Sequence, residues 1–294
     1  MSLQLRASHK DEAAEIADLL NEHARAAFGE TEIAEAEVRH WFALPEIWIR
    51  VVERDGRLVG YVASVPRGRD DTTELDVRTL DREAAEALLR AGEEGAGTRL
   101  VRVVAQGDDS VLPKVLEDGG WRPVRQSYQM RIELGDDLPE PRRPEGISLR
   151  RLQPGEELRV YEANTVAFAD DWHFRPQPFE EWRGDNFGRE NFDHSLSWLA
   201  EDGERLAGFS LNTRHFCGDL RFGWVGILGV LPRWRRRGLG TAVLQQSLQE
   251  FRRRGASRVG LGVDAENVTG AVRLYERAGM HVHRLNVMYE KALP

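Results

Sequence analysis

The amino-acid sequence repeats itself weakly, and the matched segments occur in the same order in both halves. The matched pairs are Leu3–Arg6 with Ile147–Arg150, Trp48–Ser64 with Ser197–Leu211, and Glu117–Val124 with Glu276–His283. A duplication constrains the fold more than any single motif, because both halves must then build the same unit. A chain of 294 residues has the length of about two domains. We therefore expect two tandem domains of one fold.

Each half has the sequence pattern of an α/β unit with a mixed sheet. A short strand and an amphipathic helical stretch come first, followed by two apolar runs joined by Asp55-Gly56 or Asp202-Gly203. Asp-Gly between such runs indicates a β-hairpin, because glycine tolerates the positive φ of the tight turn. Between the halves, Gly135–Gly146 contains three prolines and no periodicity, which is typical of a linker. We expect domains at 1–138 and 147–294, with a linker at 139–146.

Composition and charge argue against several classes of protein. No segment has the roughly 20 apolar residues of a membrane span, and Met1–Leu20 is charged where a signal peptide needs an apolar core. We therefore expect a cytoplasmic protein without a membrane partner. A net charge of −8 argues against nucleic acid as a partner.

The cysteine and histidine patterns predict neither a disulfide nor a metal site. Cys217 is the single cysteine, so it is either a nucleophile or a small, partly buried residue. No Cys or His spacing matches a zinc site. The alternating His281 and His283 are open to a metal role, but a solvated strand end is the simpler interpretation.

The clearest chemical signal begins with an apolar segment from Trp224 to Leu231, which Pro232 closes. Its composition is that of a buried strand. Gly226 and Gly229 inside it mark positions where a bulge forms or where a ligand approaches the backbone. The segment indicates a sheet that opens at this strand.

A basic, glycine-containing loop and a helix follow. The loop is Arg235–Thr241, and the apolar stripe of the helix runs from Leu244 to Phe251. Helix starts leave N–H groups unpaired, and Gly238 and Gly240 lack the Cβ atoms that would exclude a phosphate. No lysine follows the second glycine, so the loop is not a P-loop. We interpret it as a pyrophosphate cradle; the alternative is a glycine turn with a solvated basic edge.

Local charge fits a compact anion. The segment Arg233–Arg258 holds eight arginines and one acid, Glu250. Such a segment can hold a small anion even though the whole chain repels a polyanion.

The loop resembles the acetyl-CoA-binding motif of the GNAT superfamily of N-acyltransferases: Gln or Arg, two residues, Gly, one residue, then Gly or Ala. Arg235, Gly238 and Gly240 match it. The likeness continues downstream, at Asn267, Ala271, Leu274, Tyr275 and Gly279. It implies two tandem GNAT-like acyl-CoA N-acyltransferase domains and acetyl-CoA as co-substrate, with no metal. The acceptor is then a small-molecule or peptide amine, and the sequence leaves monomer or homodimer open.

The resemblance gives each matched position a task. The pantetheine arm would add to the backbone of the central strand, and a backbone N–H near Val230 would polarise the thioester carbonyl. Tyr275 would protonate the departing sulfur; the alternative is a core aromatic residue. Asn267 is either a ligand contact or a helix N-cap. The predicted cofactor-binding residues are Leu228, Gly229, Val230, Arg235, Arg236, Arg237, Gly238, Leu239, Gly240, Thr241 and Asn267.

The central strand offers no general base, because Phe222–Leu231 contains no carboxylate. The segment Ala169–Trp182 is acidic and aromatic, and in this family the corresponding region shapes the acceptor site. Asp171 and His173 are our candidates within it; the alternative is a surface loop.

The first half lacks this machinery. Acids at Asp81, Glu83 and Glu86 follow the corresponding strand, where a diphosphate would have to bind. Val115 or Leu116 occupies the place of the tyrosine. We expect a degenerate GNAT-like domain that binds no CoA.

One live and one degenerate domain in tandem is similar to mycothiol synthases. Their central-strand glutamate has no counterpart, since its place is near Trp224, so their substrate is not carried over. A non-catalytic acyl-CoA sensor is the main alternative function, and a binding module built on the arginines is the third.

Overall fold

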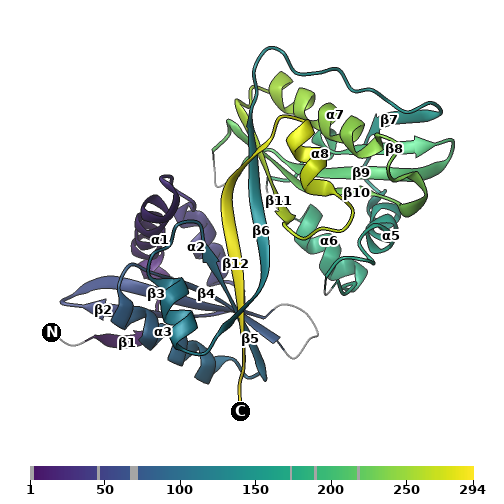
Figure 1. The fold of residues 1–294 in the computed structure, drawn as a ribbon. Helices are drawn as coiled ribbons and strands as arrows, with labels where there is room; N and C mark the ends of the chain where they lie inside the picture. The colour runs from purple at the N-terminus through teal and green to yellow at the C-terminus, as the bar shows by residue number, and fades with distance from the viewer. Residues whose placement is uncertain (1–2, 45–46, 67–71, 173, 189–190, 217–218) are drawn as a thin grey trace. The chain divides into compact units, whose positions relative to one another are not determined.

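The computed structural model describes the chain apart from residues 1–2, 45–46, 67–71, 173, 189–190 and 217–218. The chain forms two compact units (Figure 1). Unit 1 consists of Met1–Ser127 and Arg284–Pro294, and unit 2 of Tyr128–His283. The units are therefore not the two halves of the sequence: relative to the expected bounds, 128–138 join unit 2 and 284–294 join unit 1.

Unit 1 is a mixed sheet covered by helices. The strands, in sheet order, are β1 (Gln4–Ala7), β2 (Trp48–Arg54), β3 (Arg57–Pro66), β4 (Thr72–Thr79), β5 (Leu100–Gln106) and β12 (His281–Ala292). The helices are α1 (Ala13–Phe28), α2 (Glu35–Trp41), α3 (Arg82–Gly95) and α4 (Leu112–Asp118). Neighbouring strands are antiparallel except β4 and β5, which are parallel.

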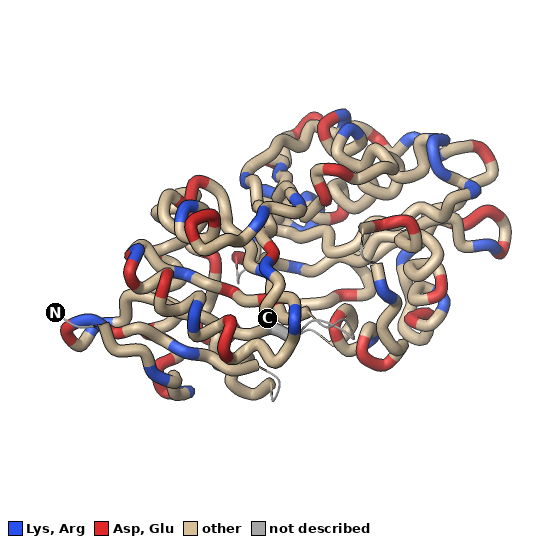
Figure 2. The backbone as a smooth tube through the Cα atoms, turned by 60° about the horizontal axis from the view of Figure 1, so that its bottom comes forward, with Lys and Arg blue, Asp and Glu red and all other residues tan. Residues whose placement is uncertain are grey.

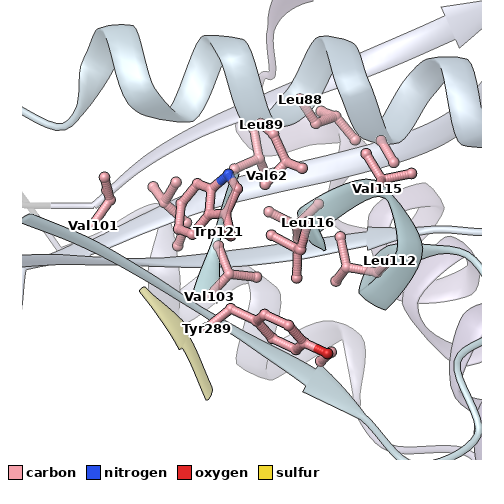
Figure 3. Close-up of a cluster of buried hydrophobic side chains, with 14 of the residues drawn as sticks. Val62, Leu88, Leu89, Val101, Val103, Leu112, Val115, Leu116, Trp121 and Tyr289 are labelled. Carbon is pink, nitrogen blue, oxygen red and sulfur yellow. The ribbon is translucent and has the colours of Figure 1, made fainter. Parts of the chain in front are cut away.

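The core of unit 1 uses residues from distant parts of the sequence. Leu88 and Leu89 on α3 and Leu116 on α4 are buried against β5 and β3 (Figure 3). Tyr289, on β12, enters the same cluster. Its strand pairs with β5 from Asn286 to Ala292. The sheet of unit 1 therefore needs a strand from the C-terminal region of the sequence.

The strands of the unit 2 sheet follow the same spatial order, but its last strand, β6, comes first in the sequence. The sheet runs β7 (Ile147–Arg151), β8 (Trp198–Asp202), β9 (Arg205–Thr213), β10 (Phe222–Val230), β11 (Arg258–Asp264) and β6 (Arg122–Glu133), whose residues from Tyr128 on belong to unit 2. Its helices are α5 (Glu157–Ala167), α6 (Phe179–Phe187), α7 (Leu239–Arg253) and α8 (Ala271–Arg277). Both predicted Asp-Gly hairpins form, β2–β3 and β8–β9. The expected α/β fold with mixed sheets is confirmed.

The two faces of the unit 2 sheet are covered by different helices (Figure 1). On one face, a Cβ at Gly223 of β10 would overlap the Phe251 ring of α7. On the other face, a Cβ at Gly229 would lie 3.4 Å from Ala167 of α5. The predicted stripe of α7 is buried, with Leu244 and Phe251 at 0% and 2% exposure.

The proline-containing segment before β7 has no regular structure but follows α7. Arg252 binds the Asp136 carboxylate, and the Gln249 side chain donates to the Pro139 carbonyl at 3.3 Å. No helix among the described residues is long and apolar enough to cross a membrane.

Candidate active site

The central strands of unit 2 separate halfway along their length. β10 and β11 are paired from Phe222/Arg258 to Val225/Leu261, although β10 continues to Val230. A β-bulge between Val225 and Ile227 places one extra residue, Gly226, at the point of separation. Gly226 on β10 and Gly262 on β11 are both solvent-exposed inside the sheet. The opening that the strand glycines predicted is present.

Backbone groups of β10 point into this opening. The Leu231 N–H donates to the Ala207 carbonyl of β9 at 3.0 Å. Peptide groups alternate sides along a strand, so those of Val230 and Leu228 point away from β9 and towards the opening. The Val230 carbonyl already accepts from Arg235 Nε at 3.1 Å. An extended ligand can therefore pair with the N–H groups of Leu228 and Val230 and with the Leu228 carbonyl.

The predicted cradle lies beside the end of β10. Gly238 is the N-cap of α7 at φ +80°, and the first bond of the helix runs from Ala242 N–H to Gly238 O at 3.0 Å. The N–H groups of residues 239–241 come before this bond, so they have no carbonyl partner within the helix. Free N–H groups at a helix start are what an anion site requires. A Cβ at Gly240 would lie 3.5 Å from Val230 Cγ2. The cradle and the strand opening are thus adjacent.

The two cradle glycines are required for different reasons. Gly238 has the left-handed conformation, and an added Cβ would meet nothing within 4 Å. Gly240 is helical, and an added Cβ would lie 2.7 Å from Leu274 Cδ1 of α8. The first glycine therefore shapes the backbone, and the second lets α7 pack closely against α8.

Acidic and basic residues are interspersed along both units (Figure 2). The arginines near the two ends of α7 differ in whether acidic side chains pair with them. At the start of α7, Arg236 and Arg237 are exposed and have no ion-pair partner among the described residues. At its end, Arg253 and Arg254 bind the buried Glu250, and Arg254 also binds Asp193 at 3.1 Å. The positive charge available to an anion is therefore concentrated at the cradle.

Tyr275 is a buried phenol on which the charge of Asp171 acts. Tyr275 is 6% exposed and packs in the cluster beneath α7. Burial, and then the charge of Asp171, raises the pKa of its hydroxyl to about 12. The phenol therefore keeps its proton at neutral pH, as a proton donor must. His173, the other base candidate, lies outside the described residues.

Comparison with known proteins identifies the family. Residues 158–280 match the family model of the acetyltransferase (GNAT) family. Mycothiol acetyltransferase of Geodermatophilus obscurus is 32% identical over 89% of this chain and 88% of its own length. The chain belongs to the GNAT acetyltransferase family.

Other relatives agree. Mycothiol acetyltransferase of Salinispora arenicola is 33% identical over 84% of this chain and 82% of its own. A GCN5-related N-acetyltransferase from Sphaerobacter thermophilus superposes with a TM-score of 0.85 at 30% identity, covering 99% of this chain and 95% of that one. A tandem GNAT protein from the clavulanic acid pathway, 14% identical, covers 99% and 98% with a TM-score of 0.77 and shares the fold. This protein is thus an acetyltransferase of tandem GNAT architecture.

In this GNAT acetyltransferase, Asn267 is not the N-cap residue of the helix that follows it. The N-cap of α8 is Gly270, at φ +82°. The Asn267 side chain accepts from the Thr269 N–H at 2.9 Å and from the N–H of Ala271, the first residue of α8, at 3.4 Å. Asn267 therefore accepts from the helix start without being its N-cap residue, and contact with the cofactor stays a prediction.

Sequence reasoning missed Gly262 and the pairing of Asp170 with Arg235. Gly262 borders the opening on β11, and the alternation of Gly260 and Gly262 inside an apolar strand was its signal. Asp170 binds Arg235 at 2.7 Å. No local pattern announces that pair, because 65 residues separate its members.

A pocket of about 530 Å³ lies elsewhere in unit 2 and contains none of the predicted residues. It is lined by Arg151, Leu152, Gln153, Pro154, Phe192, Asp193, His194, Ser195 and Arg214. Our candidate active site is the strand opening rather than this pocket, because the backbone of β10 that the sequence singled out and the unpaired start of α7 lie at the opening.

Proposed function

We propose that this acetyltransferase transfers the acetyl group of acetyl-CoA to an amine by direct attack in a ternary complex, at a single active site in unit 2. The observation that carries the proposal is the opening between β10 and β11, which ends at the start of α7. One ligand with an extended arm and a diphosphate would fill both features.

The cofactor would lie along β10 and over the cradle. Its pantetheine amides would pair with the peptide groups of Leu228 and Val230, which point into the opening. Its diphosphate would take the N–H groups of residues 239–241, beside the side chains of Arg236 and Arg237. Leu239 is 2% exposed, so only its backbone would serve the ligand.

The reaction would be a transfer of the acetyl group from sulfur to nitrogen. The amine nitrogen forms a bond to the acetyl carbonyl carbon, the oxyanion is held by a backbone N–H such as that of Val230, and the C–S bond breaks. Tyr275 gives its proton to the departing sulfur, and the proton lost by the amine passes to a base. Asp171 is our candidate base, because its carboxylate lies within electrostatic reach of Tyr275.

The corresponding strands of unit 1, β4 and β5, also separate, after the pair Leu75/Val103, but the residues beside this separation differ in a way that supports a single active site. β4 pairs with β3 without the bulge that β10 has, and Arg78 faces Tyr61 where Gly229 faces Phe209. Arg78 is buried, 8% exposed, and bound to Asp76 at 2.9 Å. The space beside β4 is thus occupied by a charged side chain.

The helix start of unit 1 is also occupied. The Asp81 side chain caps α3 by accepting from the Ala84 N–H at 3.0 Å. Arg54 in turn binds both Asp81 and Glu83. A diphosphate would have to displace an internal carboxylate here, so we propose that unit 1 is degenerate and binds no CoA.

For the acceptor, the named relatives suggest one compound to test first. They are mycothiol acetyltransferases, which makes the amine precursor of mycothiol the first candidate. Trp224 argues for a different acceptor, because it stands near the expected place of the central-strand glutamate and stacks on Phe216 at 4.2 Å. We therefore leave the proposal at an amine acceptor.

The test is a calorimetric titration with acetyl-CoA, with desulfo-CoA and ATP as controls. We expect one site per chain, and Gly238→Glu should abolish binding because a carboxylate enters the cradle. Gly146→Glu is the matched control, since Gly146 has φ +78° and equally open space. Two sites would overturn the degenerate reading of unit 1, and binding without turnover across an amine panel would favour the acyl-CoA sensor.

A further inference from the structure

Arg235 ties three parts of unit 2 together with one side chain. Its Nε donates to the Val230 carbonyl at 3.1 Å and its Nη2 to the Ala167 carbonyl at 2.7 Å. Nη1 and Nη2 hold the Asp170 carboxylate at 2.7 and 3.1 Å. The guanidinium therefore joins the end of β10, the end of α5 and the loop that follows α5. Only a planar fork of donors can make these contacts together.

This arrangement differs from what the loop motif implies. The motif makes Arg235 a member of the diphosphate cradle, whereas its guanidinium is engaged by Val230, Ala167 and Asp170. The hydrogen bond from Arg235 holds the pKa of Asp170 below its usual range, so the pair is charged at neutral pH. The side chain is thus committed to internal contacts.

The loop held by Arg235 carries the candidate base. The Asp171 N–H donates to the Phe168 carbonyl at 2.9 Å, and the Phe174 N–H donates to the Asp171 carbonyl at 3.2 Å. Together with the ion pair at Asp170, these bonds hold the backbone at Asp171. Asp171 in turn is the charge that acts on Tyr275.

We propose that the Arg235–Asp170 ion pair positions the loop that carries Asp171 against the end of β10 for acetyl transfer, and that Arg235 is a positioning residue rather than a diphosphate ligand. The inference rests on the proposed function, because it assumes acetyl transfer at the strand opening. The pair fastens the loop with Asp171 to the strand that would bind the thioester. The Arg235 side chain would then hold both the loop with the candidate base and the strand that binds the thioester.

The energetics favour a role in geometry over one in stability. The side chains of Arg235 and Asp170 are 20% and 48% exposed. Pairs this accessible contribute little to the free energy of unfolding. By contrast, a misplacement of about 1 Å near reacting groups can reduce turnover by about a hundredfold. Variants of the pair should therefore fold and still lose activity.

The experiment compares Arg235→Gln, Asp170→Asn and the double variant in the full chain. Arg205→Gln and Glu204→Gln are matched controls, because both residues are exposed at the β8–β9 hairpin. Three readouts are taken: the calorimetric Kd of acetyl-CoA, hydrogen exchange at the amides of Asp171 and Phe174, and thiol release from acetyl-CoA. The amines supplied are glucosamine, cysteine methyl ester, spermidine and a peptide with a free N-terminus.

We expect both single variants to lower kcat by about tenfold to a hundredfold, with acetyl-CoA affinity within about twofold of wild type. Exchange at the two amides should rise in both. The kcat of the double variant should be no lower than that of either single variant, because the two residues act as a unit. Asp170→Glu, which retains the carboxylate, should have a higher kcat than Asp170→Asn.

Two results would overturn the inference. If Arg235→Gln weakens acetyl-CoA binding tenfold or more while Asp170→Asn does not, Arg235 is a diphosphate ligand. If both single variants keep the wild-type kcat and the wild-type hydrogen exchange at Asp171 and Phe174, the ion pair does not position the loop. Failure of the wild-type protein to bind acetyl-CoA would instead overturn the proposed function, and with it the catalytic purpose of the pair. Hydrogen exchange would then still report whether the pair orders the loop.

Discussion

Replacing Tyr275 by phenylalanine removes one oxygen atom and tests both the burial and the chemistry of the phenol. Its hydroxyl has a pKa of about 12, raised first by burial and then by Asp171. An exposed phenol has a pKa of about 10, so folding disfavours the phenolate by about 2.7 kcal/mol. This figure sets the size of an effect that denaturation experiments can measure.

The sign of the effect follows from the higher pKa in the folded state. Below pH 10 the phenol is neutral in both states, and its contribution to stability is fully present. Between pH 10 and 12 the unfolded chain loses the proton first, so the free energy of unfolding falls. At pH 11 the loss relative to pH 8 is about 1.4 kcal/mol. The phenylalanine variant has no phenol at this position and therefore lacks this pH-dependent loss of stability.

The assay is urea denaturation of wild type and Tyr275→Phe at pH 8, 9.5 and 11. The stability difference between them should shift by about 1.4 kcal/mol across this range, in the direction that destabilises wild type. The buried phenols Tyr61 and Tyr289 also have raised pKa values, but they are present in both proteins and cancel. A difference that does not change with pH would refute the burial argument.

The same variant tests catalysis. Loss of a general acid should lower turnover by about a hundredfold while acetyl-CoA still binds. Because the phenol keeps its proton to pH 11 or above, Tyr275 should add no alkaline limb to the pH profile below pH 10. Wild-type turnover in the phenylalanine variant would remove the acid assignment.

Three further predictions concern packing and charge. Gly229→Ala should destabilise the protein by about 1–3 kcal/mol in urea denaturation, because its Cβ would lie 2.7 Å from the Phe209 ring. Gly226→Ala, whose Cβ would meet only the Leu211 carbonyl at 3.4 Å, should cost less, so equal losses would contradict the packing argument. Burial alone would raise the pKa of Glu250, but hydrogen bonds from arginines outweigh it and lower the pKa. Glu250→Gln should therefore cost about 2–3 kcal/mol at pH 7, and the gap to wild type should narrow as the pH falls below about 4.5. Asp81→Ala should cost about 1 kcal/mol in thermal or urea denaturation through loss of the α3 cap, with acetyl-CoA stoichiometry unchanged.

Local features of the site could be predicted because they depend on neighbouring residues. The positive φ of Gly238, the end of β10 before Pro232 and the buried stripe of α7 are all encoded within one or two helical turns. The sequence duplication likewise predicted two units, each with an Asp-Gly hairpin. These features follow from backbone sterics and from periodic burial, which a sequence displays directly.

Features that depend on long-range pairing could not be predicted. The side chain of Arg235 looks from sequence like another cradle cation, and only its tertiary partners reveal where it points. The bulge at Gly226 required knowledge of the register with β9. The affiliation of β12 with unit 1 is likewise a pairing choice that neither strand specifies alone.

The strand affiliation of β12 has a consequence for synthesis on the ribosome. Unit 2 is continuous in sequence, so it can complete its sheet as soon as its own residues have emerged. Unit 1 cannot, because Arg102 of β5 awaits Glu290 of β12, 188 residues later. The N-terminal unit must therefore wait with an open sheet edge, reversing the order in which domains usually mature during translation. Until β12 has been synthesised, the unpaired edge of β5 is a place where another chain can pair and start aggregation.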